Sequence, residues 1–389
     1  MMQTSKHLVA IACGGTGGHL FPGLAVGVQL QRRGCDVMLM VSPKEVDQIA
    51  AREAVGMELV TLPAIGLVRG GGFAFARGFA RSYRSACRAF KGRPLKAVLA
   101  MGGFTSAAPL VAGRLRGTAC FLHESNTIPG RANRWLSRLV QGAFVGFPQA
   151  GRLLHARNVV VTGTPVRPQF QPLSAGECRQ ELGLDPARPV VLVVGGSQGA
   201  SWVNNLVMES LPELVRLHPE LQFLHLTGSQ DRDRVAGGYQ RHSARAVVHP
   251  FLAGMHVVLG AASVAVSRAG ASSMAEIAAM QVPAILVPYP AATDNHQLHN
   301  ARAFESTGAA RTIEQGAASG PLLANWIWEL IEDGEARTRM QTALGRWHRA
   351  EAAELIAEGI LGRENPGVCQ PSEGASSSGA GRTCVTISA

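Results

Sequence analysis

Short apolar runs separated by glycine turns and by amphipathic segments recur along the chain. The runs at residues 7–13, 96–100, 119–122 and 159–162 contain mainly Val, Ile, Leu and Ala. Such continuous apolar runs are typical of strands that are buried on both faces of a sheet. Segments with helical periodicity or polar turns follow the runs, which predicts an α/β domain built on one parallel sheet.

The same pattern begins again after a proline-rich boundary at residues 168–189. A strand at 190–194 precedes the glycine turn 195–200, and further strands and helices continue to 361. We therefore expect an α/β protein with two Rossmann-like, doubly wound parallel-sheet domains, over residues 1–167 and 168–345. The Ser-, Gly- and Pro-rich residues 362–389 bury too little apolar area to fold and are expected to form a disordered tail.

Polar loops follow four predicted strands of the first domain. They are GGTGGH at 14–19, GGFTS at 102–106, HESN at 123–126 and GTPVR at 163–167. Open α/β sheets bind ligands at the carboxyl ends of their strands, so four such loops indicate a cleft. His19 stands between a loop and a helix, where it could remove a proton from an acceptor hydroxyl; a structural or capping histidine is the alternative.

The stretch 264–297 has the features of a nucleotide-diphosphate site. A helix is predicted over 271–280, with Ser272 and Ser273 at its start and Glu276 pointing away from the apolar face. The helix N-terminus attracts phosphate oxygens, and the carboxylate could accept two ribose hydroxyls. The polar loop 293–297 follows the next strand. An ordinary strand–helix–strand unit with a surface glutamate is the alternative.

A second amphipathic helix is predicted over residues 73–91, inside a segment that contains ten Lys or Arg and no acidic residue between Leu59 and His123. Aromatic side chains and arginines occupy opposite sides of it. An anionic membrane surface would suit such a helix, and a core-packed helix with a solvated basic face is the alternative. The two stripes are Phe75, Phe79, Tyr83 and Phe90 on one side and Arg77, Arg81, Arg84 and Arg88 on the other.

Composition narrows the choice of partner. The net charge of +10 favours an anionic ligand or surface, but an aromatic content of 5% without a reading motif argues against nucleic acid. The seven scattered cysteines include no C-x-x-C pair, which favours a reducing cytosol and argues against a zinc site. No apolar run of about 18 residues is present, so no membrane-spanning helix is expected.

Several other sites are disfavoured by the motifs themselves. The 14–19 loop matches neither G-x-G-x-x-G nor a Walker A loop, and the second strand ends in Ser42 where an NAD enzyme has an acidic residue. The string Asp231-Arg232-Asp233 is predicted to be solvated surface, and no metal site is expected.

Three strings carry a specific resemblance: GGTGGHLFPGLAV from Gly14, GGSQGA from Gly195, and SRAGASSMAE with PYPAATDNHQ from residue 267 onward. With GGFTSAAP, HESN and GTPVR in the same order, the chain resembles the MurG family of N-acetylglucosaminyltransferases over residues 8–361. The resemblance implies a GT-B fold, with two Rossmann-like domains facing a cleft and a helix at 346–361 returning to the first domain.

The resemblance also implies an activity. It is the inverting transfer of GlcNAc from UDP-GlcNAc to the 4-hydroxyl of MurNAc in undecaprenyl-pyrophosphoryl-MurNAc-pentapeptide, which converts lipid I to lipid II in peptidoglycan synthesis. Neither cofactor nor metal is then required. UDP-GlcNAc, lipid I, an anionic membrane and other cell-wall enzymes are the implied partners, at the cytoplasmic face of the bacterial plasma membrane. The rival hypotheses are a UDP-sugar transferase for another lipid or a small aglycone, a UDP-GlcNAc 2-epimerase, and a non-catalytic nucleotide-sugar sensor.

The resemblance further assigns roles to individual residues. It places His19 on the acceptor side, where we expect it to act as the general base, and makes Glu276 the ribose ligand. For the donor it implies diphosphate contacts at Ala271, Ser272, Ser273 and the Ser197 loop and a uracil contact at Leu252. The other implied donor contacts are Thr16, Gly17, Gly18, Asn126, Arg167, Met274, Ala275 and Gln297. Two positions depart from the family: Ser125 stands where Gln is common, and Phe104 where Tyr is common. Both changes shorten the polar reach toward the substrates.

Overall fold

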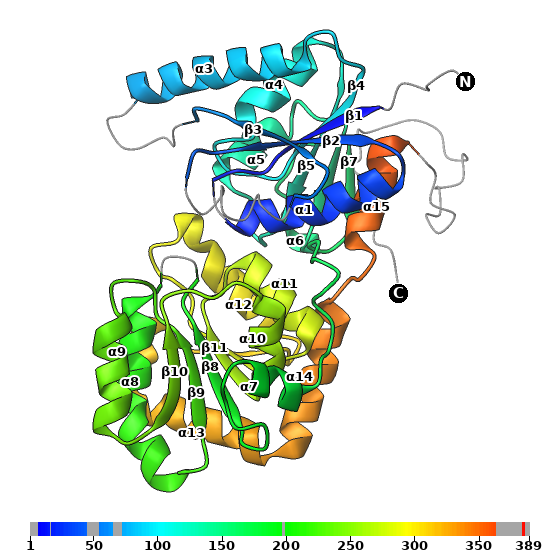
Figure 1. Cartoon of the computed structure of the whole chain (residues 1–389). Helices are drawn as coiled ribbons and strands as arrows, with labels where there is room; N and C mark the ends of the chain where they lie inside the picture. Colours follow the sequence, from blue (N-terminus) through cyan, green and yellow to red (C-terminus); the bar gives the residue numbers. More distant parts are fainter. Residues whose placement is uncertain are drawn as a thin grey trace, which may run out of the picture. The chain divides into compact units, whose positions relative to one another are not determined.

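The computed structural model describes residues 7–15, 17–44, 54–64, 72–196, 199–362 and 383–385 (Figure 1). The chain divides into two units. Unit 1 comprises Met1–Arg167 and Arg349–Ala389, and unit 2 comprises Pro168–His348. The chain thus leaves unit 1 at the start of the proline-rich segment and returns to it at Arg349.

Unit 1 is built on an eight-stranded parallel sheet with the order β14-β7-β6-β5-β4-β1-β2-β3. The chain moves outward from β1 in one direction through β2 and β3, and in the other through β4 to β7. The switch in direction lies between β1 and β4, which is where doubly wound sheets bind ligands. The strands are β1 (Leu8–Ala12), β2 (Asp36–Val41), β3 (Glu58–Thr61), β4 (Leu95–Ala100), β5 (Ala119–Glu124), β6 (Gly142–Val145), β7 (Asn158–Val161) and β14 (Thr383–Val385).

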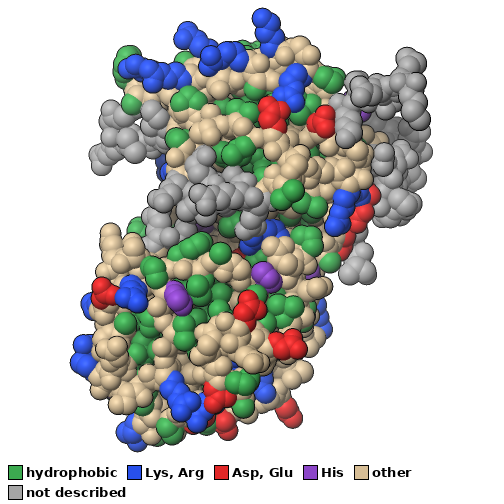
Figure 2. Space-filling view, viewed as in Figure 1, with side chains coloured by type: hydrophobic (Ala, Val, Ile, Leu, Met, Phe, Trp, Pro, Cys, Tyr) green, Lys and Arg blue, Asp and Glu red, His purple; other side chains and the backbone are tan. Residues whose placement is uncertain are grey.

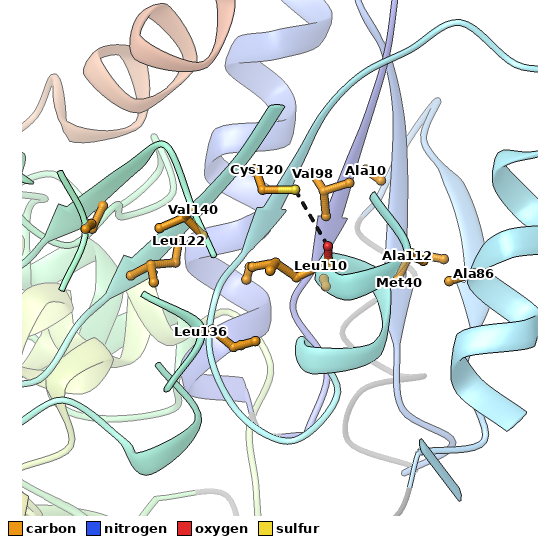
Figure 3. Packing of buried hydrophobic residues seen from close by; sticks show 14 of the residues in the cluster. Ala10, Met40, Ala86, Val98, Leu110, Ala112, Cys120, Leu122, Leu136 and Val140 are labelled. Carbon is orange, nitrogen blue, oxygen red and sulfur yellow. Dashed lines mark hydrogen bonds between the residues drawn. The ribbon is translucent and has the colours of Figure 1, made fainter. Parts of the chain in front are cut away.

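Helices cover both faces of this sheet. On one face, α1 and α15 pack side by side, and Leu20, Leu24 and Ile356 join the core there. On the other face, α3, α4 and α5 supply Phe90, Leu110 and other core residues (Figure 3). The described helices of the unit are α1 (Gly17–Arg32), α3 (Gly72–Phe90), α4 (Ala107–Leu115), α5 (Arg131–Leu136), α6 (Pro148–Gly151) and α15 (Ala352–Leu361).

Cys120 illustrates how a polar group is accommodated in this core. Its Sγ donates to the Leu110 carbonyl oxygen at 3.6 Å (Figure 3). Burial raises the pKa of the Cys120 thiol to about 11, so the thiol keeps its proton at neutral pH. A protonated thiol acts as a small apolar side chain with a weak donor, which suits this position.

Unit 2 contains a six-stranded parallel sheet with the order β10-β9-β8-β11-β12-β13, whose switch point lies between β8 and β11. Both sheets confirm the predicted class of two doubly wound parallel-sheet domains. The strands are β8 (Val190–Val194), β9 (Gln222–Leu226), β10 (Arg245–His249), β11 (Val264–Ser267), β12 (Ala284–Leu286) and β13 (Arg311–Thr312). The described helices are α7 (Ala175–Glu181), α8 (Ser201–Leu217), α9 (Arg232–Arg241), α10 (Met255–Ala261), α11 (Ala271–Met280), η2 (Thr293–Asn295), α12 (His296–Glu305), η3 (Gln315–Ala317), α13 (Gly320–Glu332) and α14 (Gly334–Trp347).

The end of α14 shows why the chain returns to unit 1 later than residue 346. The Trp347 ring stacks on Phe304 of α12 with centroids 4.5 Å apart, and its Nε1 donates to Thr307 Oγ1 at 2.8 Å. Both contacts hold the last turn of α14 in unit 2. The return therefore begins at Arg349, three residues after the predicted start.

The tail contains one element that the sequence analysis did not predict. Thr383–Val385 forms β14, which pairs in parallel with β7 at the edge of the sheet. The expectation of a tail without structure is wrong for these three residues. A β-branched Thr–Cys–Val run favours extended backbone, and the β7 edge offers unpaired backbone groups. The remaining tail residues beyond Gly362 lie outside the described part of the chain.

Candidate active site

The N-terminus of α11 lies at the switch point of unit 2. β11 ends at Ser267, and α11 begins at Ala271 with Gly270 as its N-cap residue. Glycine has no side chain with which to cap the helix, and Ser272 and Ser273 lie in the first turn. The partial positive charge of the α11 N-terminus therefore lies at the carboxyl edge of the sheet, which suits a phosphate.

Glu276 follows in the second turn of the same helix and is half-buried. Met274 and Ile277 are buried on the sheet side, as predicted, while Ala275 and Glu276 are more accessible. The helix thus fixes a carboxylate about one turn from its own N-terminus. That spacing places an acceptor for hydroxyl groups beside a site for phosphate.

The glycine loop after β8 forms the other side of this switch point. Two of its glycines leave no space for a side chain: a Cβ on Gly199 would lie 2.4 Å from the Thr227 carbonyl oxygen, and one on Gly195 would lie 2.5 Å from the Ala200 nitrogen. Gly196 and Gly199 also have φ angles of 89° and 74°. Ser197, the predicted diphosphate contact in this loop, lies outside the described residues.

Arg268 holds the segment that follows β12 through hydrogen bonds to its backbone. The sequence analysis did not identify it as a site residue. Its side chain is buried, and Nη1 donates to the carbonyl oxygens of Val287 at 3.1 Å and Pro288 at 3.2 Å. The next residue, Tyr289, donates its backbone N–H to Gln297 Oε1 at 2.9 Å. Because its oxygen is engaged, the Gln297 amide has a fixed orientation in the first turn of α12. The loop predicted over 293–297 thus consists of η2 and the start of α12. The signal in the sequence is an arginine directly after a buried strand.

Leu252, the predicted uracil contact, is half-buried in the loop after β10. β10 is the edge strand of the sheet and is separated from β8 by β9. The structure therefore places Leu252 at the same carboxyl edge as α11, two strands away from the switch point.

In unit 1, the loops after β1 and β4 meet at the corresponding switch point. Ser106 joins them: its Oγ lies 2.9 Å from the Ala12 carbonyl oxygen and accepts the Gly102 N–H at 3.1 Å. A Cβ on Gly14 would lie 2.3 Å from the Ser42 nitrogen, so backbone alone fills this position. The GGTGGH and GGFTS loops, two of the four polar loops predicted to line one edge of the sheet, thus lie against each other.

His19 belongs to the first turn of α1, because the helix begins at Gly17 and not at residue 20 as predicted. Gly17 and Gly18 are its first two positions, and Thr16 lies outside the described residues. The imidazole rests on the second glycine loop: a Cβ on Gly102 would lie 2.8 Å from His19 Cε1, and one on Gly103 would lie 3.2 Å from Cδ2. The structure therefore brings His19 to the β1/β4 switch point.

Two further predicted donor contacts have fixed side chains in unit 1. The Arg167 guanidinium lies 4.0 Å from the centroid of the Phe21 ring of α1. Asn126 donates both its backbone N–H and its Nδ2 to Glu124 Oε1, each at 2.9 Å. Glu124 Oε2 accepts from Gly130 N and from Asn133 Nδ2. The buried Glu124 carboxylate thus organises the HESN loop, a role that spacing alone does not reveal.

His123 does not join the loop as predicted, because β5 extends through Glu124. The ring is wholly buried, with Nε2 3.1 Å from the Gly163 carbonyl oxygen. Burial lowers the pKa of His123 to about 4, so the imidazole is neutral at physiological pH and donates from Nε2. His123 therefore links β5 to the loop after β7 as a structural residue.

The basic helix α3 faces the protein with its aromatic stripe. Phe90 is wholly buried in the core, Tyr83 packs against that core, and Phe75 and Phe79 are half-buried. This arrangement favours the core-packing interpretation for the stripe. The arginine stripe is exposed, and Figure 2 shows Lys and Arg side chains gathered along α3. Phe73, at the start of the helix, is 84% exposed.

The Asp231-Arg232-Asp233 string is solvated only in part. Arg232 and Asp233 are exposed, but the Asp231 side chain is 13% exposed and accepts from Asn204 Nδ2 at 2.9 Å. A hydrogen bond from Ser201 lowers the pKa of Asp231 and keeps it charged. The prediction of solvated surface is therefore wrong for Asp231, because its place at the N-terminus of α9 turns it toward α8.

The described part of the chain lacks both a metal-ligand cluster and a helix suited to span a membrane. No cluster of three or more His, Cys, Asp or Glu side chains there could hold a metal ion. No described helix combines the length and the apolar character needed to cross a bilayer.

Comparison with known proteins agrees with this architecture. Residues 9–145 match the glycosyltransferase family 28 N-terminal domain, and residues 190–358 match the C-terminal domain of the same family. A relative in Anaeromyxobacter sp. (strain K) is 36% identical over 365 residues, which cover 90% of this chain and 91% of the relative. One in Pelobacter propionicus is 35% identical over 371 residues and covers 90% of this chain and 98% of its own length.

A solved structure, that of Acinetobacter baumannii MurG, superimposes with a TM-score of 0.71 at 27% identity, covering 92% of this chain and 99% of that one. Two doubly wound sheets with glycine-loop switch points, matched to these domains, define a family 28 glycosyltransferase of the GT-B fold. Within that class, the chain belongs to the MurG family, the UDP-N-acetylglucosamine–N-acetylmuramyl-(pentapeptide) pyrophosphoryl-undecaprenol N-acetylglucosamine transferases.

Proposed function

We propose that this chain transfers GlcNAc from UDP-GlcNAc to the 4-hydroxyl of the MurNAc residue of lipid I, forming lipid II and UDP with inversion at the anomeric carbon. Membership of the MurG family supports the choice of substrates. The observation that carries the donor assignment is the α11 N-terminus at the switch point, capped by Gly270, with Glu276 one turn further on.

In unit 2, the donor's diphosphate would lie against the first amides of α11, near Ala271, Ser272 and Ser273. The departing UDP gains negative charge as the bond between C1 and the β-phosphate oxygen breaks. A helix N-terminus is oriented in advance toward such charge and needs no reorganisation during the reaction. Glu276 would accept the two ribose hydroxyls, with Leu252 beside the uracil and Gln297 beside the GlcNAc.

In unit 1, His19 is the proposed general base. It would take the proton of the MurNAc 4-hydroxyl as that oxygen attacks C1 of GlcNAc, a task suited to an imidazole near neutral pH. Its contact with Gly102 and Gly103 holds the ring in place, so little rotamer freedom is lost when the substrate binds. Asn126 and Arg167 are the proposed polar contacts nearby.

The lipid acceptor places the enzyme at a membrane surface, and α3 supports a peripheral site there. Its exposed arginines and Phe73 offer cationic groups and one apolar side chain to anionic headgroups. This surface consists of Arg77, Arg81, Arg84, Arg88 and Phe73, which we name the α3 basic surface.

Release of UDP from UDP-GlcNAc, measured with and without a lipid I analogue, tests the proposal. We expect UDP release that depends on the lipid I analogue, a disaccharide–lipid product, and retained activity after chelation of divalent ions. UDP-GlcNAc binding without any UDP release would contradict transferase activity. Release of ManNAc, or equal rates with unrelated lipid acceptors, would contradict the assignment of substrates.

A further inference from the structure

A chain of buried hydrogen bonds lies beneath the glycine loop of unit 2. The Tyr239 hydroxyl is 3.0 Å from His225 Nδ1, and His225 Nε2 is 2.9 Å from Asn204 Oδ1. Asn204 Nδ2 then donates to the Thr227 carbonyl oxygen at 3.0 Å and to Asp231 Oδ2 at 2.9 Å. The first four of these side chains are at most 2% exposed.

The direction of every bond in this chain is determined. Both Asn204 Nδ2 hydrogens are donated to oxygen acceptors, so Asn204 Oδ1 accepts and His225 Nε2 carries the proton. His225 Nδ1 is then an acceptor, and the Tyr239 hydroxyl donates to it. Burial lowers the pKa of His225 to about 3 and raises the pKa of Tyr239, so both groups are neutral as this arrangement requires.

The chain ends at the peptide that supports the glycine loop. The Thr227 carbonyl oxygen lies 2.4 Å, and Gly228 Cα 2.8 Å, from the position that a Cβ on Gly199 would occupy. The Gly199 backbone therefore rests directly on the Thr227–Gly228 peptide. The next residue, Ala200, is the N-cap of α8, which begins at Ser201, and its side chain cannot cap the helix. Any shift of Thr227 is passed to this loop and to the first amides of α8.

We propose that Tyr239, His225 and Asn204 are positioning residues that set Gly199 and the first amides of α8 for the diphosphate of the nucleotide sugar. The inference rests on the proposed donor function. It adds to the α11 N-terminus a second group of phosphate-binding amides, whose position is fixed by the Thr227–Gly228 peptide. None of the three side chains touches the ligand. Their effect is on the diphosphate alone, since the loop lies at the switch point and not at the base or ribose.

Tyr239→Phe provides the first test because it removes only the hydroxyl at the start of the chain. Without that donor, His225 can change tautomer, which turns Nε2 into an acceptor and leaves the Asn204 amide without a fixed orientation. Isothermal titration with UDP and with uridine should show UDP affinity about fivefold weaker and uridine affinity unchanged, as expected for one buried hydrogen bond. Ser210→Ala is the matched control, since Ser210 is a buried hydroxyl of α8 that donates to Val207 O away from the loop.

His225 provides a test by rescue. Glutamine can donate from one end and accept at the other, so His225→Gln should keep UDP affinity within about twofold of the wild type. His225→Leu fills similar space but makes neither bond, and should weaken UDP binding by about tenfold or more. In the transferase assay, His225→Leu should have a higher KM for UDP-GlcNAc than the wild type, while its kcat at saturating donor changes little.

The outcomes separate this inference from the function beneath it. Unchanged UDP affinity in folded Tyr239→Phe and His225→Leu variants overturns the inference, as does equal weakening of UDP and uridine. If His225→Gln and His225→Leu weaken UDP equally, the hydrogen bonds are not responsible and the inference also fails. A wild-type chain that binds neither UDP nor UDP-GlcNAc overturns the proposed function first.

Discussion

The switch points of the two units share a backbone arrangement but differ in the groups that they present to a ligand. Each has a glycine loop pressed against a neighbouring peptide, with Gly14 on Ser42 in unit 1 and Gly199 on Thr227 in unit 2. In unit 2, helices α8 and α11 follow Ala200 and Gly270, whose side chains offer no capping oxygen, so the positive ends of two helix dipoles lie at the switch point. In unit 1, the first turn of α1 carries His19 toward the second loop.

The difference shows how one architecture serves two tasks. Backbone amides at helix N-termini suit a ligand whose charge is fixed and large, such as a diphosphate. A titratable side chain suits a step in which a proton moves. The fold sets the edge at which ligands bind, and the residues placed on that edge determine the chemistry.

The largest expected effect is the loss of turnover when the His19 imidazole is removed. This variant tests whether unit 1 supplies the proton acceptor. We expect His19→Ala to lower kcat by about 10³-fold, in the range of general-base catalysis, while UDP-GlcNAc affinity stays within about twofold. Steady-state kinetics with a lipid I analogue and titration with UDP-GlcNAc measure the two quantities. His155→Ala, an exposed histidine of the same unit, is the control. If His19→Ala retains its turnover, unit 1 supplies the base from another residue.

Acid should destabilise both units through one buried histidine in each, His123 and His225. Unfolded histidine binds a proton near pH 6.5, but the folded side chains do so only near pH 4 and pH 3. The unfolded state thus binds more protons below pH 6.5, so the free energy of unfolding falls as the pH is lowered. For His123 the loss is roughly 3 kcal/mol between pH 6.5 and pH 4, at about 1.4 kcal/mol per unit.

Urea unfolding of the wild type at pH 7 and pH 5, compared with His123→Gln, measures this effect. Glutamine keeps a donor for the Gly163 carbonyl and cannot titrate. The variant should therefore lose less stability between the two pH values than the wild type. Equal pH slopes for both proteins would show that His123 binds its proton equally well in the folded and unfolded states, so that burial does not lower its pKa.

Replacing Glu276 should have a smaller effect, on UDP affinity, and tests whether unit 2 binds the ribose through this residue. Glu276→Gln replaces two charge-assisted hydrogen bonds by neutral ones, so UDP affinity should fall by about 10-fold to 30-fold without a change in unfolding temperature. A UDP analogue without ribose hydroxyls should bind the wild type and the variant equally. Glu335→Gln, on α14 with a side chain that is 90% exposed, is the control. A variant that loses affinity equally for both ligands would place Glu276 away from the ribose.

The sequence predicted the parts of this picture that depend on local pattern. Helix α11 has the predicted bounds, 271–280, because its apolar spacing and its preceding Gly agree. The short strands β3 and β6 were not predicted, since Glu58 and the Gly142–Ala143 pair disfavour strands. The roles of Arg268 and Asn204 depend on partners about 20 or more residues away in the sequence, which periodicity does not reveal. Periodicity left two interpretations of the aromatic stripe of α3 open, and the burial of Phe90 favours the core-packed one.

The smallest expected effect is on vesicle binding, which tests whether α3 of unit 1 contacts the membrane. Each arginine near an anionic surface contributes about 1 kcal/mol, so Arg81→Gln should weaken binding to vesicles of anionic lipid about fivefold, and more salt should reduce the difference. Phe73→Ser should weaken binding independently of salt, because its contribution is apolar. Arg157→Gln removes the same charge from an exposed position of unit 1 outside α3. If Arg81→Gln and Arg157→Gln weaken vesicle binding equally, net charge alone drives association and the α3 basic surface has no special role. If only the Arg81 and Phe73 variants lose binding, the membrane contact belongs to unit 1, which also holds the proposed base.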